Sequence, residues 1–113
     1  LRYVTALSGA CLLIPYLVWE ELKGFDADNF KAYFEDDDLC VRANLSGIPV
    51  VLSQMSFTKH LSAQTMTRAN EEHNEIFEQS KQNFQKKYPT VQWDSSGMYD
   101  ISSLMKEKNE KEI

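Results

Sequence analysis

The sequence predicts an α/β chain in which short strands are flanked by helices, with a long helix in the C-terminal part. Three observations predict this class. A continuous apolar run occupies residues 9–14, helix-stop signals follow at short intervals, and the pattern after residue 66 becomes that of a long polar helix. Short apolar runs that alternate with helical segments are typical of α/β folds. We therefore expect two segments, residues 1–66 and a helical extension with a charged tail at 67–113.

The first segment is expected to alternate between strand and helix. The run G-A-C-L-L-I at 9–14 is consistent with a strand covered on both faces, although periodicity alone does not separate it from buried helix. Pro15 and Gly24 are placed to begin and end a short helix over about residues 16–23. Four acids at 35–38 suit the start of a second helix, for which Gly47 resembles a C-cap.

Extended pieces and a long helix are expected after Gly47. Residues 48–52 indicate a strand, with Pro49 favouring its start or a sheet edge, and residues 56–59 indicate a second extended piece before His60. Thr67 is the candidate N-cap of a helix over 67–88. A docked short helix and a frayed end should follow. The apolar side of the long helix is sparse and consists of Ile76, Phe77, Phe84 and Tyr88.

Composition narrows the range of partners. The 113 residues, 42% of them hydrophobic, suffice for one core or part of one. A net charge of -5 with no basic stripe argues against nucleic acid. The most apolar stretch, 6–19, is too short for a spanning helix. The alternating charges of the long C-terminal helix give no basic face for anionic lipid, so we do not expect membrane binding. Cys11 and Cys40 lack metal or redox spacing and are expected to be reduced core residues. The chain opens with Leu1, and we expect a fragment of a longer protein.

One ordered constellation points to a function. Its pieces are S-G-A at 8–10, G-F-D at 24–26, E-D-D-D-L with Arg42 at 35–42, G-I-P-V-V at 47–51, and His60. In this order the pieces resemble the second half of family 2 inverting glycosyltransferases of the GT-A fold. The resemblance covers residues 8–62, about half of the chain, and it implies a partial, Rossmann-like GT-A domain. It also implies transfer of a sugar from a nucleotide-sugar donor to an acceptor hydroxyl with inversion.

The resemblance assigns roles to the acids at the second helix start. An acceptor hydroxyl is a weak nucleophile, so a carboxylate within hydrogen-bond reach has to take its proton. By resemblance Asp36 is this base and Glu35 shapes the acceptor pocket, while Asp38 and Arg42 hold the helix in place. The usual pattern has an apolar residue where Asp37 stands. A third carboxylate there raises local repulsion and is expected to raise a pKa in the cluster.

The remaining assignments depend more heavily on the resemblance. His60 matches a family histidine that approaches the metal or the diphosphate, and Asp26 of the G-F-D loop is an acceptor-binding candidate. Mn²⁺ or Mg²⁺ is expected in the parent protein, held mainly by residues outside this chain. The D-x-D spelled by residues 26–28 lies in the wrong loop for the family's metal motif. The three aspartates 36–38 lack the glycine and glutamate of a calcium loop.

Plainer interpretations of the same residues stay open. Acids at a helix start often serve only as a solvated cap, and His60 is as often an ordinary surface or core histidine as a ligand. His73 is expected to be solvated. Phe77, Phe84 and Trp93 are expected in the core rather than as platforms for sugar stacking, a question that an exposed Trp93 would reopen. The alternative function is a non-catalytic binding or assembly module, whose acids cap a helix and whose long helix packs on a partner.

The expected partners follow from the resemblance. They are a nucleotide-sugar donor and a glycan, lipid-linked or protein acceptor, in the cytoplasm. Because the nucleotide-binding half is not found here, the chain alone is expected to be inactive. Strand edges left without neighbours are adhesive, which makes a homo-oligomer possible.

Overall fold

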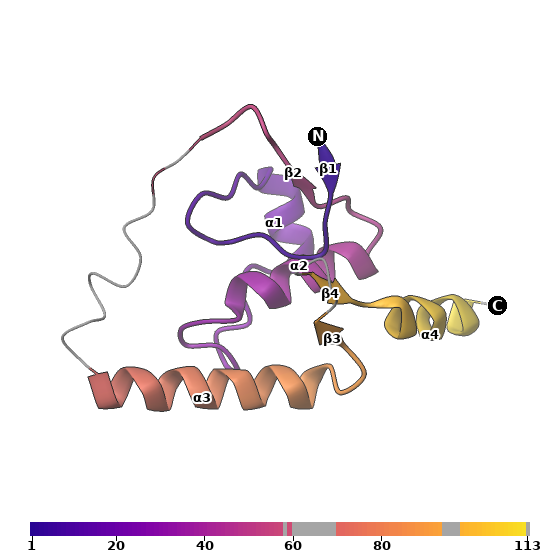
Figure 1. Ribbon diagram of the computed structural model, residues 1–113. Coiled ribbons are helices and arrows are strands. Elements are labelled where there is room, and N and C mark those ends of the chain that lie inside the picture. Colours follow the sequence, from indigo (N-terminus) through magenta and orange to yellow (C-terminus); the bar gives the residue numbers. More distant parts are fainter. Residues whose placement is uncertain (58, 60–69, 94–97, 113) are drawn as a thin grey trace.

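The computed structural model describes residues 1–57, 59, 70–93 and 98–112. In this part of the chain, four helices and two small antiparallel sheets form a small α/β domain (Figure 1). The predicted α/β class is confirmed at this level. The elements in chain order are β1 (Arg2–Tyr3), α1 (Tyr16–Leu22), α2 (Glu35–Leu45), β2 (Val51–Leu52), α3 (Asn70–Lys87), β3 (Gln92–Trp93), β4 (Tyr99–Asp100) and α4 (Ser102–Glu112).

Each of the two described sheets is a two-stranded antiparallel pair. β1 pairs with β2 in the register Arg2 to Leu52, and β3 pairs with β4 in the register Trp93 to Tyr99. The first sheet joins the start of the chain to the segment that follows α2. β2 confirms only the end of the strand expected over 48–52, because pairing is limited to the residues that face β1.

The strand expected over 9–14 is wrong. Residues 9 and 10 form a turn and the following residues lack regular structure, since no described strand pairs with them. Leu12 and Ile14 pack against the core, whereas Leu13 between them is 95% exposed. Cys11 is also exposed, so the expectation that it lies in the core is wrong as well, whereas Cys40 is buried. The apolar run therefore lies along the core as a loop rather than inside a sheet.

α1 and α2 end in the same way, in backbone of left-handed conformation. After α1, Lys23 has φ 61° and Gly24 has φ 66°, and the Gly24 N–H donates to the carbonyl of Trp19. After α2, Gly47 has φ 75°, and the Ile48 N–H donates to the carbonyl of Ala43. Both endings satisfy helix carbonyls that would otherwise lack donors. The predicted short helix and the two glycine stop signals are thereby confirmed.

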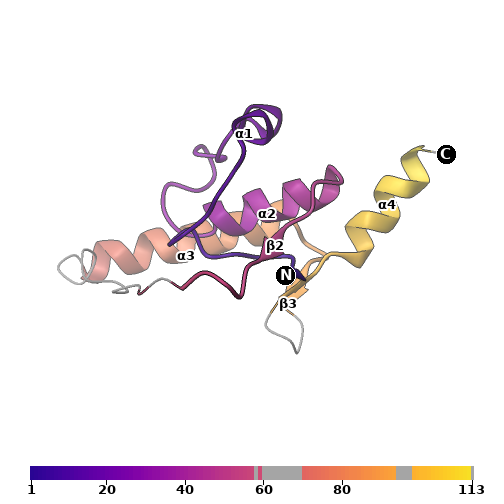
Figure 2. The ribbon, with the colours of Figure 1, turned by 90° about the horizontal axis from the view of Figure 1, so that it is seen from above.

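α2 lies at the centre of the domain because it contributes to both buried clusters. Its residues Leu39, Cys40 and Ala43 pack with α1 and with the segments around β1 and β2. Val41, which is completely buried, packs instead with the aromatic cluster formed by Phe30, Phe84, Tyr88 and Tyr99, together with Ile101. Figure 2, seen from above, shows α2 lying over α3, with α4 projecting to one side. The second cluster joins residues on both sides of position 66.

The structure confirms the long helix and the C-terminal helix, but not every boundary and buried side chain predicted for them. α3 begins at Asn70 in the described chain, and the candidate N-cap Thr67 lies outside the described residues. Phe84 of α3 and Tyr88, which directly follows the helix, are buried, whereas Phe77 of α3 is 36% exposed. The extended piece expected over 56–59 is not a strand at its described residues, and Thr58 lies outside them. Among the described helices, none combines the length and the apolar character that crossing a membrane demands.

Candidate functional site: an acidic and aromatic pocket

A pocket of about 410 Å³ lies at the N-terminal end of α2. This volume falls within the range of small-molecule sites, roughly 300 to 1,000 Å³. Its wall combines the first three carboxylates of α2 with aromatic side chains from distant segments. The described residues that line it are Ala6, Leu7, Ser8, Tyr33, Phe34, Glu35, Asp36, Asp37, Phe77 and Trp93.

The backbone that leads into the pocket is unusual. Tyr33 and Phe34 both have φ 64°, in the left-handed region that non-glycine residues rarely occupy. Phe34 is also the N-cap of α2, and its carbonyl accepts from the Asp38 N–H at 2.8 Å. Two consecutive left-handed residues turn the chain sharply, so both aromatic rings and the carboxylates after them line one pocket. Packing of Phe34 against Phe84, with ring centroids 5.4 Å apart, holds this turn.

Asp36, the predicted base, lies in the pocket with its carboxylate held by two backbone donors. The N–H of Gly9 donates to Oδ2 at 2.7 Å, and the N–H of Asp37 donates to Oδ1 at 2.9 Å. A Cβ on Gly9 would lie 3.4 Å from Oδ2, which is an ordinary van der Waals contact. Two pieces of the sequence constellation, 27 positions apart, thus meet at one carboxylate. Each carboxylate oxygen keeps acceptor capacity for a further donor.

Glu35 and Asp37, on either side of Asp36, have raised pKa values. Burial is the main cause in both, and the charge of Asp36 adds to it. The pKa of Asp37 rises to about 6, even though its Oδ2 accepts from the Tyr99 hydroxyl at 2.9 Å. The Oε2 atom of Glu35 is buried and has no hydrogen-bond partner among the described residues. The raised pKa expected from a third carboxylate in the cluster is therefore present, with burial as its largest cause.

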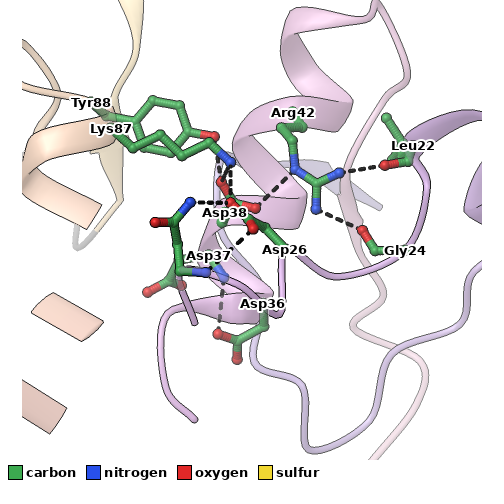
Figure 3. A network of polar contacts seen from close by, with 10 residues as sticks. Leu22, Gly24, Asp26, Asp36, Asp37, Asp38, Arg42, Lys87 and Tyr88 are labelled. Atoms are coloured by element: carbon green, nitrogen blue, oxygen red, sulfur yellow. Dashed lines mark hydrogen bonds and ion pairs between the residues drawn. The ribbon is translucent and has the colours of Figure 1, made fainter. Parts of the chain in front are cut away.

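Asp38 belongs to a different environment, as Figure 3 shows. Its side chain is fully buried and contacts Arg42 Nε at 2.8 Å, Lys87 Nζ at 2.7 Å and the Tyr88 hydroxyl at 2.5 Å. Arg42 in turn donates to the carbonyls of Leu22 and Gly24, at 2.5 and 2.7 Å. These contacts tie the first turns of α2 to the end of α1 and to the end of α3. Asp36 lies apart from this network in the same view.

Of the other two predicted site residues, Asp26 is not among those that line this pocket. Asp26 contacts Asn29 and Lys87, at 2.8 and 3.0 Å, and lines a separate hollow with Arg42. The Asn29 hydrogen bond is the first cause of its lowered pKa, with Lys87 contributing as well. His60 lies outside the described residues.

Aromatic residues of the C-terminal half complete the pocket, although the sequence predicted that they would lie in the core or in solvent. Trp93, expected in the core, is 60% exposed, and its ring lies edge-on to Tyr99 with centroids 4.7 Å apart. Phe77 approaches Tyr33 with centroids 5.3 Å apart. His73, expected to be solvated, is half-buried and hydrogen-bonds the Tyr33 hydroxyl at 2.8 Å. No linear spacing links these residues to the acids at 35–37, because the fold alone brings α3 and β3 beside α2.

The described residues offer no candidate metal centre. Nowhere in this part of the chain do three or more His, Cys, Asp or Glu side chains gather as ligands around one point. Cys40 is also poorly suited to bind a metal, because metals bind the thiolate form of cysteine. Burial, the main cause, raises the pKa of the Cys40 thiol to about 11. Comparison of the chain with family models, with curated proteins and with solved structures found no match.

Proposed function

We propose that the chain carries the acceptor side of an inverting glycosyltransferase of the GT-A type, with Asp36 as the catalytic base. The base takes the proton of an acceptor hydroxyl while that oxygen attacks the anomeric carbon of a nucleotide sugar. Glu35 shapes the acceptor pocket beside it. A cytoplasmic location and a glycan, lipid-linked or protein acceptor belong to the same proposal.

The position of Asp36 carries this proposal. Its carboxylate lines a pocket of about 410 Å³, is fixed by the N–H groups of Gly9 and Asp37, and is flanked by Glu35. A base has to be held within hydrogen-bond reach of the proton that it removes, and a fixed carboxylate in a concave site meets this need. The network of Asp38 and Arg42 supports the proposal further, because it anchors the helix turn that presents Asp36.

The leaving nucleoside diphosphate requires positive charge, which Mn²⁺ or Mg²⁺ supplies when bound in enzymes of this kind. The described residues do not fit such an ion, as no ligand group is assembled among them. We therefore assign the metal and the nucleotide to residues beyond those described here. The part of the reaction proposed for this chain is binding of the acceptor and removal of its proton.

Asp36→Asn tests the proposal in a protein that joins this sequence to a nucleotide-binding half. The amide keeps the shape of the carboxylate and cannot take a proton. We expect the release of nucleoside diphosphate, measured with a panel of nucleotide sugars, to fall by roughly 100- to 10,000-fold. Thermal unfolding should shift only slightly, because Asp36 lies outside the buried network and the amide loses just one of the two backbone donors, Gly9 or Asp37.

Asp28→Asn is the matched control, since Asp28 is exposed and lines the hollow on the other side of the buried network. It should leave transfer unchanged. Equal activity of Asp36→Asn and the control would remove the catalytic claim and leave the alternative, a non-catalytic binding module. The buried role of Asp38 in joining three helices is the observation that favours this alternative.

A further inference from the structure

The Trp93 side chain is exposed, but contacts with its neighbours fix its position. Its ring is 60% accessible, yet strand pairing places it opposite Tyr99, whose ring packs against it at 4.7 Å with an interplanar angle of 80°. The Tyr99 hydroxyl donates to Asp37 Oδ2 at 2.9 Å, which connects the indole to the acidic turn of α2. Burial of an indole ring is strongly favourable. An indole that the fold leaves exposed at a pocket therefore offers a rigid apolar face that a ligand can cover.

A second aromatic group lies in the wall of the same pocket. Phe77 of α3 is 36% exposed and contacts the rings of Tyr33 and Phe34, with centroids 5.3 and 5.6 Å apart. The hydrogen bond between the Tyr33 hydroxyl and the His73 ring fixes Tyr33 in turn. Apolar ring faces and hydrogen-bonding oxygens are therefore presented to the same space of about 410 Å³. Such a surface suits a ligand whose faces are apolar and whose rim is polar.

The polar part of the wall has one sign of charge. Three carboxyl groups line the pocket, and no Lys, Arg or His is among its described lining residues. The buried Oε2 of Glu35, which lacks a described partner, requires a donor and gains nothing from a further acceptor. An anionic ligand would meet repulsion from this acidic part of the wall, whereas hydroxyl or ammonium groups would satisfy its oxygens.

We propose that the pocket binds a saccharide ring that carries no acidic group, with one face of the ring on Trp93 and its hydroxyl or ammonium groups on Glu35 and Asp36. This inference rests on the proposed function, because it names the class of acceptor whose hydroxyl Asp36 would deprotonate. It selects a glycan over an acceptor that presents phosphate, carboxylate or plain peptide to the pocket.

Titration of the isolated chain with three methyl glycosides of one ring skeleton tests the proposal directly. They are the neutral glucoside, its 2-amino derivative and the glucuronide, repeated in the galacto and manno series. The variant Trp19→Phe makes Trp93 the single tryptophan, so its fluorescence reports on the pocket. We expect the amino sugar to bind most tightly, the neutral sugar less tightly, and the uronide about tenfold or more weakly than the neutral sugar, equivalent to about 1.4 kcal/mol.

Trp93→Ala, measured by NMR or calorimetry, should weaken binding of the neutral sugar by about tenfold or more, a loss of the size that stacking on an aromatic ring typically gives. Tyr16→Ala is the control, as Tyr16 is 71% exposed and lies outside the pocket. Binding that is indifferent to Trp93, or a uronide that binds as tightly as the neutral sugar, would overturn the inference. So would the absence of binding by every neutral and amino sugar.

The same variants separate this inference from the proposed function. Asp36→Asn should keep saccharide binding, because an amide still forms hydrogen bonds, while transfer is lost. Saccharide binding that depends on Trp93, combined with transfer that does not depend on Asp36, would support the inference and reject the catalytic role. Transfer that depends on Asp36, without any saccharide binding at Trp93, would do the reverse.

Discussion

Three consecutive aspartates, 36 to 38, have three different environments. Successive side chains of a helix are rotated by about 100°, so neighbours in sequence face different parts of the fold. Asp36 faces the pocket, Asp37 meets the Tyr99 hydroxyl, and Asp38 is enclosed by Arg42, Lys87 and Tyr88. Asp36 and Asp37 therefore share the pocket with different partners, whereas Asp38 is a separate buried group that Arg42 and Lys87 balance.

The raised pKa of Asp37 has a predictable effect on stability. Folding raises the pKa from 3.8 to about 6, so between these values the native state binds more protons than the unfolded chain. Stability therefore falls as the pH rises through this interval. Asp37→Asn cannot ionise and should be more stable than the wild type above pH 6, by on the order of 1 kcal/mol after allowance for solvent screening.

Urea unfolding from pH 3 to pH 8 measures this difference. The gain of Asp37→Asn should be absent below the unfolded pKa of 3.8 and level above about pH 6. Asp28→Asn, at an exposed position, provides the baseline. A variant that is less stable than the wild type at pH 8 would show that the charged form of Asp37 is favoured by folding.

At the scale of the elements, the ends of α1 and α2 provide a matched pair of glycines. Gly24 and Gly47 both have positive φ, 66° and 75°, so alanine at either position is strained by about 1 to 2 kcal/mol. Their surroundings differ. A Cβ at Gly24 would lie 2.8 Å from the Trp19 ring, whereas a Cβ at Gly47 would meet nothing within 4 Å.

Gly24→Ala should therefore cost more stability than Gly47→Ala, by about 1 to 3 kcal/mol, because the Trp19 ring has to move within a packed region. The free energy of unfolding in urea measures both variants. Gly24 also accepts from Arg42 through its carbonyl, and displacement of that carbonyl would loosen the Asp38 network. Equal losses of unfolding free energy at the two positions would mean that the Trp19 ring can move aside at no energetic cost.

At the scale of the whole molecule, one of the exposed apolar surfaces lies around α1 and the loop before it. Leu13, Leu17 and Tyr16 are 95%, 79% and 71% exposed. An apolar pocket of about 380 Å³ lies beside them, with Leu12, Leu13 and Val18 in its wall. The adjoining sheet of β1 and β2 has only two strands, so each has an unpaired edge within the described chain. Such surfaces promote association.

We expect the isolated chain to associate as its concentration rises. Sedimentation velocity from micromolar to submillimolar concentration should show a shift to larger species. The double variant Leu13→Gln, Leu17→Gln should reduce this shift, because it removes exposed apolar area without adding charge. Trp93→Gln, which removes an exposed aromatic elsewhere, should leave it unchanged. A monomer over the whole range would contradict the expectation.

The sequence by itself determined the helices and, for α1 and α2, where they end. Pro15, Gly24 and Gly47 act through local backbone geometry, which depends little on the rest of the chain, and α1, α2 and α3 were predicted on such signals. The pairing of Asp38 with Arg42 is similarly local, since residues four apart share one face of a helix. The acids at 35–37 could also be selected as candidates from their position at a helix start.

Only the tertiary structure decided which apolar runs become strands and what surrounds the acids. Residues 9–14 have the composition of a buried strand, but a strand also needs a neighbour with which to pair, and none is present in the described chain. Trp93, Phe77 and Tyr99 reach the acidic turn across dozens of residues through the packing of α3, β3 and β4. Contacts of this kind depend on long-range packing, which residue type and local spacing do not specify.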